Sequence, residues 1–316
     1  MPDSAADSLL VVILGPTASG KSSLAASLAR HFAGEIVSCD SVAVYRNFEI
    51  GTAKPSPLER AAVPHYLIDI AEPGEAFTAG EYARQARTAI ADISNRRKLA
   101  IVVGGTGLYL RALLEGLFPG PQRSEDLRER LRDMAAERGS PYLHRILTRF
   151  DRASAAQIHP NDAAKLIRAI EVCLAARQPM SALWQQRGRD PLAGYHVLRI
   201  GLNPEREQLY ARINRRAAAM FERGLIEETH FLLRQYPLLA EATPFTSLGY
   251  KQAVQHLRGE LSRERAVTLT QQGHRNYAKR QMTWFRREPE VTWLSGFGDD
   301  PEIQAQAEAI VGTVRS

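Results

Sequence analysis

The chain has 316 residues, 44% of them hydrophobic and 24% charged, which is the composition of an ordinary globular protein and excludes a disordered or fibrous one. A formal net charge of +6 mildly favours a polyanionic partner. Cys39 and Cys173 stand far apart without metal-ligand spacing, so they predict no disulfide framework and suit a reducing cytosol. The first apolar run, residues 9–14, is too short for a signal peptide or a membrane span, so we expect a cytoplasmic protein with no membrane partner.

A complete phosphate-loop motif, G-x-x-x-x-G-K-[ST], lies at residues 15–22. Residues 9–14 before it predict a buried strand, and residues 22–32 after it carry apolar side chains at helical spacing. Backbone N–H groups of such a loop wrap a di- or triphosphate at a helix N-terminus, so a chance glycine-rich turn is the weaker alternative. Lys21 is expected at the outer phosphate, and the Ser22 hydroxyl on Mg²⁺. The expected diphosphate-binding residues are Gly15, Pro16, Thr17, Ala18, Ser19, Gly20, Lys21 and Ser22.

Strands and helices alternate after this loop. Gly34 is expected to end the first helix. Apolar runs predict strands at residues 35–39 and 99–103, with a short extended piece at 64–69 and a helix at 78–93. This alternation predicts an α/β fold with a parallel sheet covered by helices on both faces.

The pattern changes at the Pro-Gly-Pro sequence of residues 119–121. Residues 124–187 have helical periodicity, many arginines and no convincing strand, and a strand pattern returns at 196–202. We therefore expect an all-helical domain inserted into the phosphate-loop α/β domain. The predicted domains are a core of residues 1–119 and 193–316 and a helical insertion of residues 120–192.

Helices dominate the last third of the chain. Asn203-Pro204 is expected to begin a long helical region, because Asn is a good N-cap and Pro suits the first turn. Gly224 and Pro237 interrupt this region. A last long helix is expected at residues 262–285, followed by a strand at 291–294.

Polar or glycine-rich turns follow three of the predicted strands, at 15–22, 40–41 and 104–107. Ligands of open parallel sheets bind outside the carboxyl ends of the strands, so these turns are expected to face one crevice. Asp40 is the natural acid/base or metal carboxylate there, and a plain turn aspartate is the alternative. Thr106 follows two glycines and can approach a ligand closely, or it can belong to a plain tight turn.

Nucleotide hydrolases normally have an apolar strand that ends in an aspartate assisting Mg²⁺. The clearest strand, residues 99–103, ends in Gly-Gly-Thr instead, and Leu67-Ile68-Asp69 matches the pattern over too few residues. ATP hydrolysis is therefore disfavoured, and the loop can instead bind the diphosphate of another compound.

Basic and aromatic residues alternate at 274–287. On a helix, Arg275, Lys279 and Arg286 fall on one stripe, which can track a phosphate backbone. The alternative is a solvated helix face above buried aromatic side chains. A second basic cluster, Arg212, Arg215 and Arg216, can cap a leaving diphosphate or can be surface charge.

Taken together, these motifs resemble the tRNA dimethylallyltransferases, also called tRNA isopentenyltransferases. The match follows the family in order along nearly the whole chain. At residue 43 many members carry Gln where this chain has Ala43, so details of base recognition are open. The matching motifs are residues 15–22, Asp40-Ser41, Val44-Tyr45-Arg46, Ile50-Gly51-Thr52-Ala53-Lys54-Pro55, Pro64-His65, Leu67-Ile68-Asp69, Gly104-Gly105-Thr106-Gly107-Leu108-Tyr109, His159-Pro160-Asn161-Asp162, Arg168-Ala169-Ile170-Glu171-Val172, Gly249-Tyr250-Lys251, Ala278-Lys279-Arg280-Gln281 and Thr283-Trp284-Phe285.

The resemblance implies transfer of a dimethylallyl group from dimethylallyl diphosphate to N6 of the adenosine 3′ to the anticodon (position 37), in tRNAs that read codons beginning with U. Asp40 is then the general base, and Lys21, Thr106, Arg216 and Mg²⁺ at Ser22 stabilise the departing diphosphate. The base would leave the anticodon-loop stack for a pocket between the domains. The family also implies a monomer. The residues expected to contact the anticodon stem-loop are Asp40, Ser41, Val42, Ala43, Thr106, Arg128, Lys165, Arg168, Gly249, Tyr250, Lys251, Arg275, Lys279 and Arg280.

Two other classes of function stay open at this point. A small-molecule kinase or NTPase would use the same loop for ATP, and a tRNA-binding module would keep the basic helix without catalysis. A transferase that acts on free adenine nucleotides is a variant of the tRNA transferase. The helical insertion and the basic helix favour a macromolecular acceptor over a free nucleotide.

Overall fold

The computed structural model describes residues 8–117, 120–121, 124–187 and 190–315. The chain divides into two compact units. The core unit comprises Met1–Leu114 and Leu192–Ser316, and the helical unit comprises Glu115–Pro191. The domain boundary expected at Pro119 lies outside the described residues.

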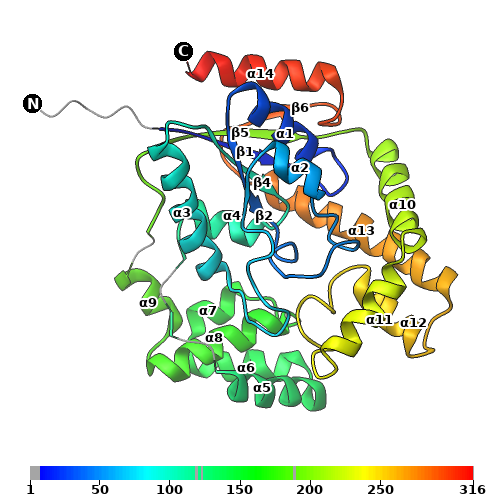
Figure 1. Cartoon of the computed structure of the whole chain (residues 1–316). Coiled ribbons are helices and arrows are strands. Elements are labelled where there is room, and N and C mark those ends of the chain that lie inside the picture. The colour runs from blue at the N-terminus through cyan, green and yellow to red at the C-terminus, as the bar shows by residue number, and fades with distance from the viewer. Residues whose placement is uncertain (1–7, 118–119, 122–123, 188–189, 316) are drawn as a thin grey trace, which may run out of the picture. The chain divides into compact units, whose positions relative to one another are not determined.

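A six-stranded sheet forms the centre of the core unit (Figure 1). Its order is β3-β2-β4-β1-β5-β6, and every pairing is parallel. The central strands are continuous apolar runs, as strands covered on both faces require. The predicted parallel sheet is confirmed. The strands are β1 (Ser8–Leu14), β2 (Glu35–Cys39), β3 (His65–Tyr66), β4 (Ala100–Gly104), β5 (Tyr195–Leu202) and β6 (Val291–Leu294).

Helices cover both faces of this sheet (Figure 1). Along β1, Leu10, Val12 and Leu14 belong to the apolar cluster that includes α3 and α4. Val11 and Ile13 belong to the opposite cluster, with α1 and α14, because successive side chains of a strand point to opposite faces. The helices of the core unit are α1 (Lys21–His31), α2 (Pro57–Ala62), α3 (Ala79–Asn95), α4 (Gly107–Leu114), α10 (Arg206–Glu222), α11 (Leu225–Gln235), α12 (Tyr250–Leu257), α13 (Arg263–Phe285) and α14 (Pro301–Arg315).

Two helix ends differ from the sequence prediction. Helix α1 ends with Phe32 as its C-cap, and Gly34 instead lets the chain pass close to β4, because a Cβ there would lie 2.8 Å from the Leu99 carbonyl oxygen. Helix α10 is capped by Glu205, whose carboxylate accepts hydrogen bonds from the Glu207 and Gln208 amides. The prediction of Asn203 as the N-cap was therefore wrong. The backbone N–H of Asn203 donates to the Leu294 carbonyl and continues the β5–β6 pairing.

Helix α14 was not predicted from the sequence. It packs Ile303, Ala307 and Val311 against the sheet. These residues have the i, i+4, i+8 spacing of one helical face, so the signal was present in the sequence.

The helical unit contains five helices among the residues that the structure describes, in agreement with the helical periodicity of residues 124–187. It has its own apolar cluster, with α8 at its centre. Asp151 caps α7 and also accepts hydrogen bonds from the amide and hydroxyl of Ser181 at the start of α9. The helices are α5 (Glu125–Arg138), α6 (Ser140–Phe150), α7 (Arg152–Gln157), α8 (Ala163–Ala176) and α9 (Met180–Arg187).

None of the described helices combines the length and the apolar character that crossing a bilayer would require.

Candidate active site

The phosphate loop joins β1 to α1, as the motif predicts. Gly20 is the N-cap of α1 with φ 84°, and Gly15 has φ 147°, conformations that residues with a Cβ rarely adopt. A Cβ at Gly20 would also lie 2.7 Å from the Gly298 amide nitrogen. The loop thus depends on glycine both for its backbone and for close contact with the segment before α14.

A cavity of about 330 Å³ in the core unit is lined by this loop and by the ends of β2 and β4. Asp40, Gly104 and Gly105 border it, together with Arg216 of α10 and Gln281 of α13. The expected convergence of three strand ends on one crevice is therefore present. Thr106 does not line this cavity. Its hydroxyl accepts a hydrogen bond from the Ser41 amide (3.1 Å) and so braces the turn that follows β2.

Two cations of this cavity have no carboxylate partner. Nζ of Lys21 donates to the Pro16 carbonyl at 2.7 Å, and Arg216 makes no hydrogen bond or ion pair within the described part of the chain. Burial, and after it the neighbouring Arg216 guanidinium, lower the pKa of Lys21 to about 7, although Asp40 acts in the opposite direction. Burial also lowers the pKa of Arg216. An anionic ligand would compensate this charge.

Asp40 divides its two carboxylate oxygens between two environments. Oδ1 accepts hydrogen bonds from the amides of Val42 (2.8 Å) and Ala43 (3.2 Å), which closes a turn after β2. Among the described residues, Oδ2 has no hydrogen-bond partner. Asp40 is thus a turn aspartate with one oxygen left to accept a proton or a cation.

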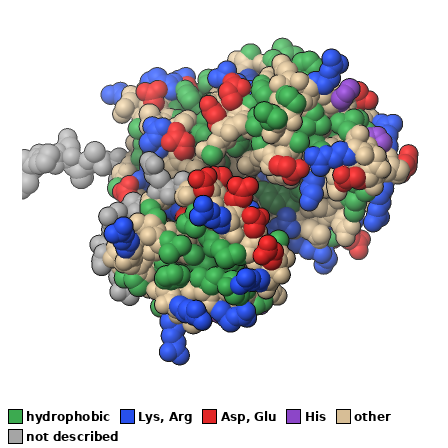
Figure 2. Space-filling model, turned by 90° about the horizontal axis from the view of Figure 1, so that it is seen from below, with side chains coloured by type: hydrophobic (Ala, Val, Ile, Leu, Met, Phe, Trp, Pro, Cys, Tyr) green, Lys and Arg blue, Asp and Glu red, His purple; other side chains and the backbone are tan. Residues whose placement is uncertain are grey.

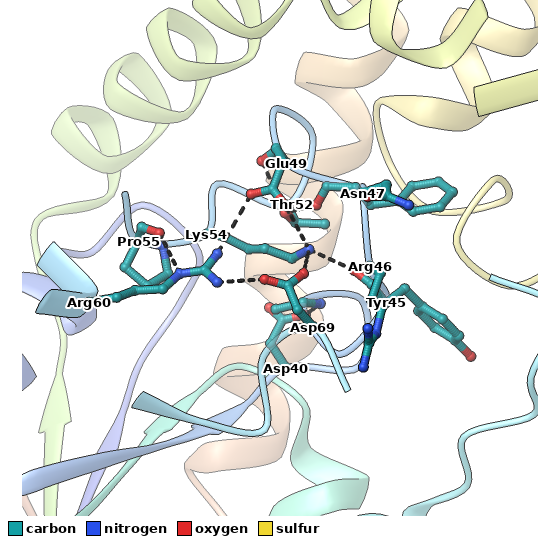
Figure 3. Close-up of polar contacts among 12 residues, drawn as sticks. Asp40, Tyr45, Arg46, Asn47, Glu49, Thr52, Lys54, Pro55, Arg60 and Asp69 are labelled. Atoms are coloured by element: carbon teal, nitrogen blue, oxygen red, sulfur yellow. Dashed lines mark hydrogen bonds and ion pairs between the residues drawn. The ribbon is translucent and has the colours of Figure 1, made fainter. Parts of the chain in front are cut away.

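A polar network that sequence reasoning did not assign to the site reaches the cavity through Lys54, which lines it. Figure 3 shows the contacts of this network. The Lys54 side chain is completely buried (0% exposed), and its Nζ donates to Asp69 (2.5 Å) and to the Tyr45 carbonyl (2.6 Å). Asp69 also binds Arg60, so it serves this network rather than Mg²⁺. The Asp69 amide donates to the Ala43 carbonyl at 3.2 Å, which ties the network to the Asp40 turn. The sequence signals were the family motifs that contain Tyr45, Lys54 and Asp69, and none of them indicated that these residues bind one another.

Helix α13 turns its aromatic residues toward the strand ends. The Tyr277 hydroxyl donates to the Gly105 carbonyl at 3.1 Å, and Trp284 stacks with Arg111. Lys279 and Arg280 are exposed. Of the predicted stripe, Lys279 and Arg286 are exposed and Arg275 is half-buried, so contact of the stripe with a phosphate backbone stays a prediction. The aromatic side chains have structural contacts.

Several of the expected tRNA contacts have internal partners. Tyr250 is fully buried (0% exposed) and its hydroxyl bonds to Glu228 and to the Gly51 amide, so its side chain has no surface to offer a ligand. Gly249 is the N-cap of α12, and Lys251 is exposed. The Arg275 guanidinium binds the Asn214 side chain.

In the helical unit, Arg128 and Arg168 both bind the buried Glu171, at 2.9 and 2.6 Å, and the exposed Lys165 pairs with Asp162. On the face drawn in Figure 2, Lys and Arg side chains lie in separate groups between acidic ones rather than in one continuous patch.

The oxygen donors of the cavity fit a hard cation. Within the described residues no cluster of three or more His, Cys, Asp or Glu side chains forms a ready metal site. Ser22 and Asp40 both border the cavity, however, and hydroxyl, carboxylate and phosphate oxygens with water are the ligands that Mg²⁺ prefers.

Comparison with known proteins shows the family of the chain. A model of the family described as IPP transferase matches residues 43–288. The tRNA dimethylallyltransferase of Koribacter versatilis (strain Ellin345) is 66% identical, over 97% of this chain and 99% of that protein. That of Solibacter usitatus (strain Ellin6076) is 57% identical, over 94% and 96%. Both alignments span nearly the entire chain.

Solved structures show the same likeness. The tRNA isopentenylpyrophosphate transferase of Bacillus halodurans aligns with a TM-score of 0.71 and 36% identity over 96% of each chain. A eukaryotic dimethylallyltransferase acting on tRNA aligns with a TM-score of 0.76 and 25% identity, over 97% of this chain and 78% of that one. The chain therefore belongs to the IPP transferase family.

Proposed function

We propose that the chain transfers a dimethylallyl group from dimethylallyl diphosphate to N6 of the adenosine at position 37 of tRNAs that read codons beginning with U. The observation that carries the proposal is that one cavity brings together Lys21 and Arg216, to which no carboxylate of the described residues is bound, and Asp40, whose Oδ2 has no hydrogen-bond partner among those residues. The cations match a leaving diphosphate, and the carboxylate matches a nitrogen that loses a proton. The names of the relatives support the same reaction.

The reaction follows from these positions. The adenosine N6 attacks C1 of the dimethylallyl group, the C1–O bond breaks, and diphosphate leaves. Asp40 takes the proton from N6 through its free Oδ2, while Lys21, Arg216 and the loop amides bind the charge that develops on the diphosphate. Mg²⁺ held by the Ser22 hydroxyl and phosphate oxygens would neutralise part of that charge.

A phosphate loop without a hydrolytic aspartate argues against the kinase or NTPase alternative. Asp69, at the carboxyl side of β3, is occupied by Lys54 and Arg60. The proposed occupant of the loop is a diphosphate that departs whole.

The acceptor is a tRNA anticodon stem-loop whose target base leaves its stack to reach the cavity. Lys251, Lys279 and Arg280 are exposed and available to its phosphates. The proposal includes a monomeric enzyme acting in the cytoplasm.

The test is a prenylation assay. The protein, Mg²⁺ and dimethylallyl diphosphate are incubated with a tRNA that has adenosine at position 37, and the digested tRNA is examined for N6-dimethylallyladenosine. A matched tRNA with guanosine at position 37 is the control. We expect product from the first tRNA alone, and Asp40→Asn is expected to remove it while leaving tRNA affinity within a few-fold. Turnover of ATP on a small acceptor, with no tRNA product, would refute the proposal.

A further inference from the structure

Gln281 of α13 connects two loops that are far apart in the sequence. Its side chain is almost completely buried (4% exposed). The amide oxygen Oε1 accepts a hydrogen bond from the Thr17 backbone N–H at 2.7 Å, inside the phosphate loop. The amide nitrogen Nε2 donates to the Gly105 carbonyl at 3.0 Å, in the turn after β4. One partner is a donor and the other an acceptor, so together they fix the orientation of the amide.

The turn after β4 is shaped to receive this side chain. A Cβ at Gly105 would lie 2.0 Å from Nε2 of Gln281, so any other residue would displace the amide. Tyr277, one helical turn before Gln281, donates a second hydrogen bond to the same carbonyl at 3.1 Å. The Gly105 carbonyl is thus held from one face of α13.

The bridge continues to the candidate base. Thr106 follows Gly105, and its hydroxyl accepts the Ser41 amide at 3.1 Å, next to Asp40. The connection runs from the phosphate loop through Gln281 to the Gly105–Thr106 turn and on to the Asp40 turn. Because Gln281 uses the Thr17 N–H, it also fixes how the neighbouring loop amides are presented to a phosphate.

We propose that Gln281 is a positioning residue that sets the spacing and orientation of the phosphate loop relative to the turn carrying the proton acceptor. The expected effect of Gln281 on catalysis rests on the proposed function. The effect of Gln281 on the phosphate loop does not depend on the identity of the prenyl acceptor.

The test compares Gln281→Met with Gln272→Met, the same substitution at an exposed position of the same helix. Misplacement of a reacting group by about 1 Å can cost about 100-fold in rate. We therefore expect Gln281→Met to lower kcat about 10- to 100-fold and to weaken binding of inorganic diphosphate with Mg²⁺, while KM for tRNA stays within two-fold. Gln272→Met should change none of these quantities. If both variants have the same kcat and the same diphosphate affinity, the proposal is wrong.

A second pair of variants separates positioning from lost stability. Gly105→Ala should impair diphosphate binding in the wild-type background because the new methyl group meets Nε2. In a Gln281→Ser background the methyl group has room, so Gly105→Ala should cost little more there. Additive losses in the double variant would overturn the bridge.

The binding readout keeps this inference separate from the function. If wild-type protein binds diphosphate but prenylates no tRNA, the proposed function fails, and the Gln281 effect on diphosphate affinity still supports the positioning role. If diphosphate affinity is insensitive to both Gln281 variants, the positioning role fails whatever the acceptor is.

Discussion

The cavity of the core unit and the helical unit differ in whether their cations bind a carboxylate. In the cavity, Lys21 and Arg216 have no carboxylate bound to them within the described part of the chain. In the helical unit, Arg128 and Arg168 share Glu171, whose side chain is completely buried. Burial would raise the pKa of Glu171, but hydrogen bonds from both arginines and from the Ser124 amide outweigh it and lower the pKa to about 2.

This difference distinguishes cations that stabilise the fold from cations that can bind an anionic ligand. A buried cation paired with a carboxylate recovers the cost of its desolvation inside the protein. A buried cation without such a partner recovers it when an anion binds. Arginine content alone does not distinguish these cases, and Arg128 and Arg168 were expected to contact tRNA because of the family resemblance. Both guanidinium groups bind Glu171, and the Arg168 side chain is still 38% exposed, so the contact with tRNA stays a prediction.

The strongest way to break this comparison is to remove a cation from the cavity. Arg216→Gln should lower kcat/KM for dimethylallyl diphosphate about 10²- to 10³-fold, the cost of deleting one preorganised donor to a developing negative charge. Thermal stability should stay the same or rise, because an uncompensated cation disappears. Steady-state kinetics and a melting curve measure the two effects. A large drop in melting temperature would mean that Arg216 supports the fold.

The opposite result is expected when the shared carboxylate of the helical unit is changed. Glu171→Gln should destabilise the helical unit by about 3 kcal/mol, because two cations lose their common counter-charge in a buried setting. The exposed Glu129→Gln on α5 is the matched control and should change little. Hydrogen exchange of amides in α5 and α8 measures the effect. Unchanged protection would show that the cluster is not a stabilising element.

A third expectation concerns the protonation of Lys21 when a ligand binds. Burial and the neighbouring Arg216 lower its pKa to about 7, so a fraction of the protein carries a neutral Lys21 near neutral pH and this fraction grows as pH rises. A bound diphosphate favours the charged form and raises this pKa, so binding takes up protons, and affinity falls as pH rises through 7. Calorimetry with inorganic diphosphate at pH 8, in buffers of different ionisation enthalpy, should show uptake approaching about one proton. Lys21→Arg should abolish it. Equal heats in all buffers would contradict a lowered pKa.

The sequence predicted those parts of the site that depend on neighbours in the chain. The phosphate loop, Asp40 and the turn at residues 104–107 were identified because strand, turn and helix follow one another in a fixed pattern. Gln281 was not assigned a role, since its partners lie 264 and 176 residues away and no local pattern encodes such pairs. The Lys54–Asp69 pair was also missed, because no helical or strand spacing relates two residues 15 positions apart in a loop region. Asp69 was compared with a hydrolytic aspartate and counted in a family motif without a role, and its side chain binds two cations.

The smallest effect is expected at exposed cations, which belong to neither group. Lys279 and Arg280 lie at the surface of α13. If they contact tRNA phosphates, replacing both with Ala should reduce the slope of log K against log salt concentration by about 1 to 2. The double variant Arg30→Ala with Arg84→Ala, at exposed sites on α1 and α3, removes the same charge and should leave the slope unchanged. Filter binding of tRNA over a salt series measures both. Equal slopes for the two double variants would assign α13 only its internal contacts, because net charge alone would then account for any loss of affinity.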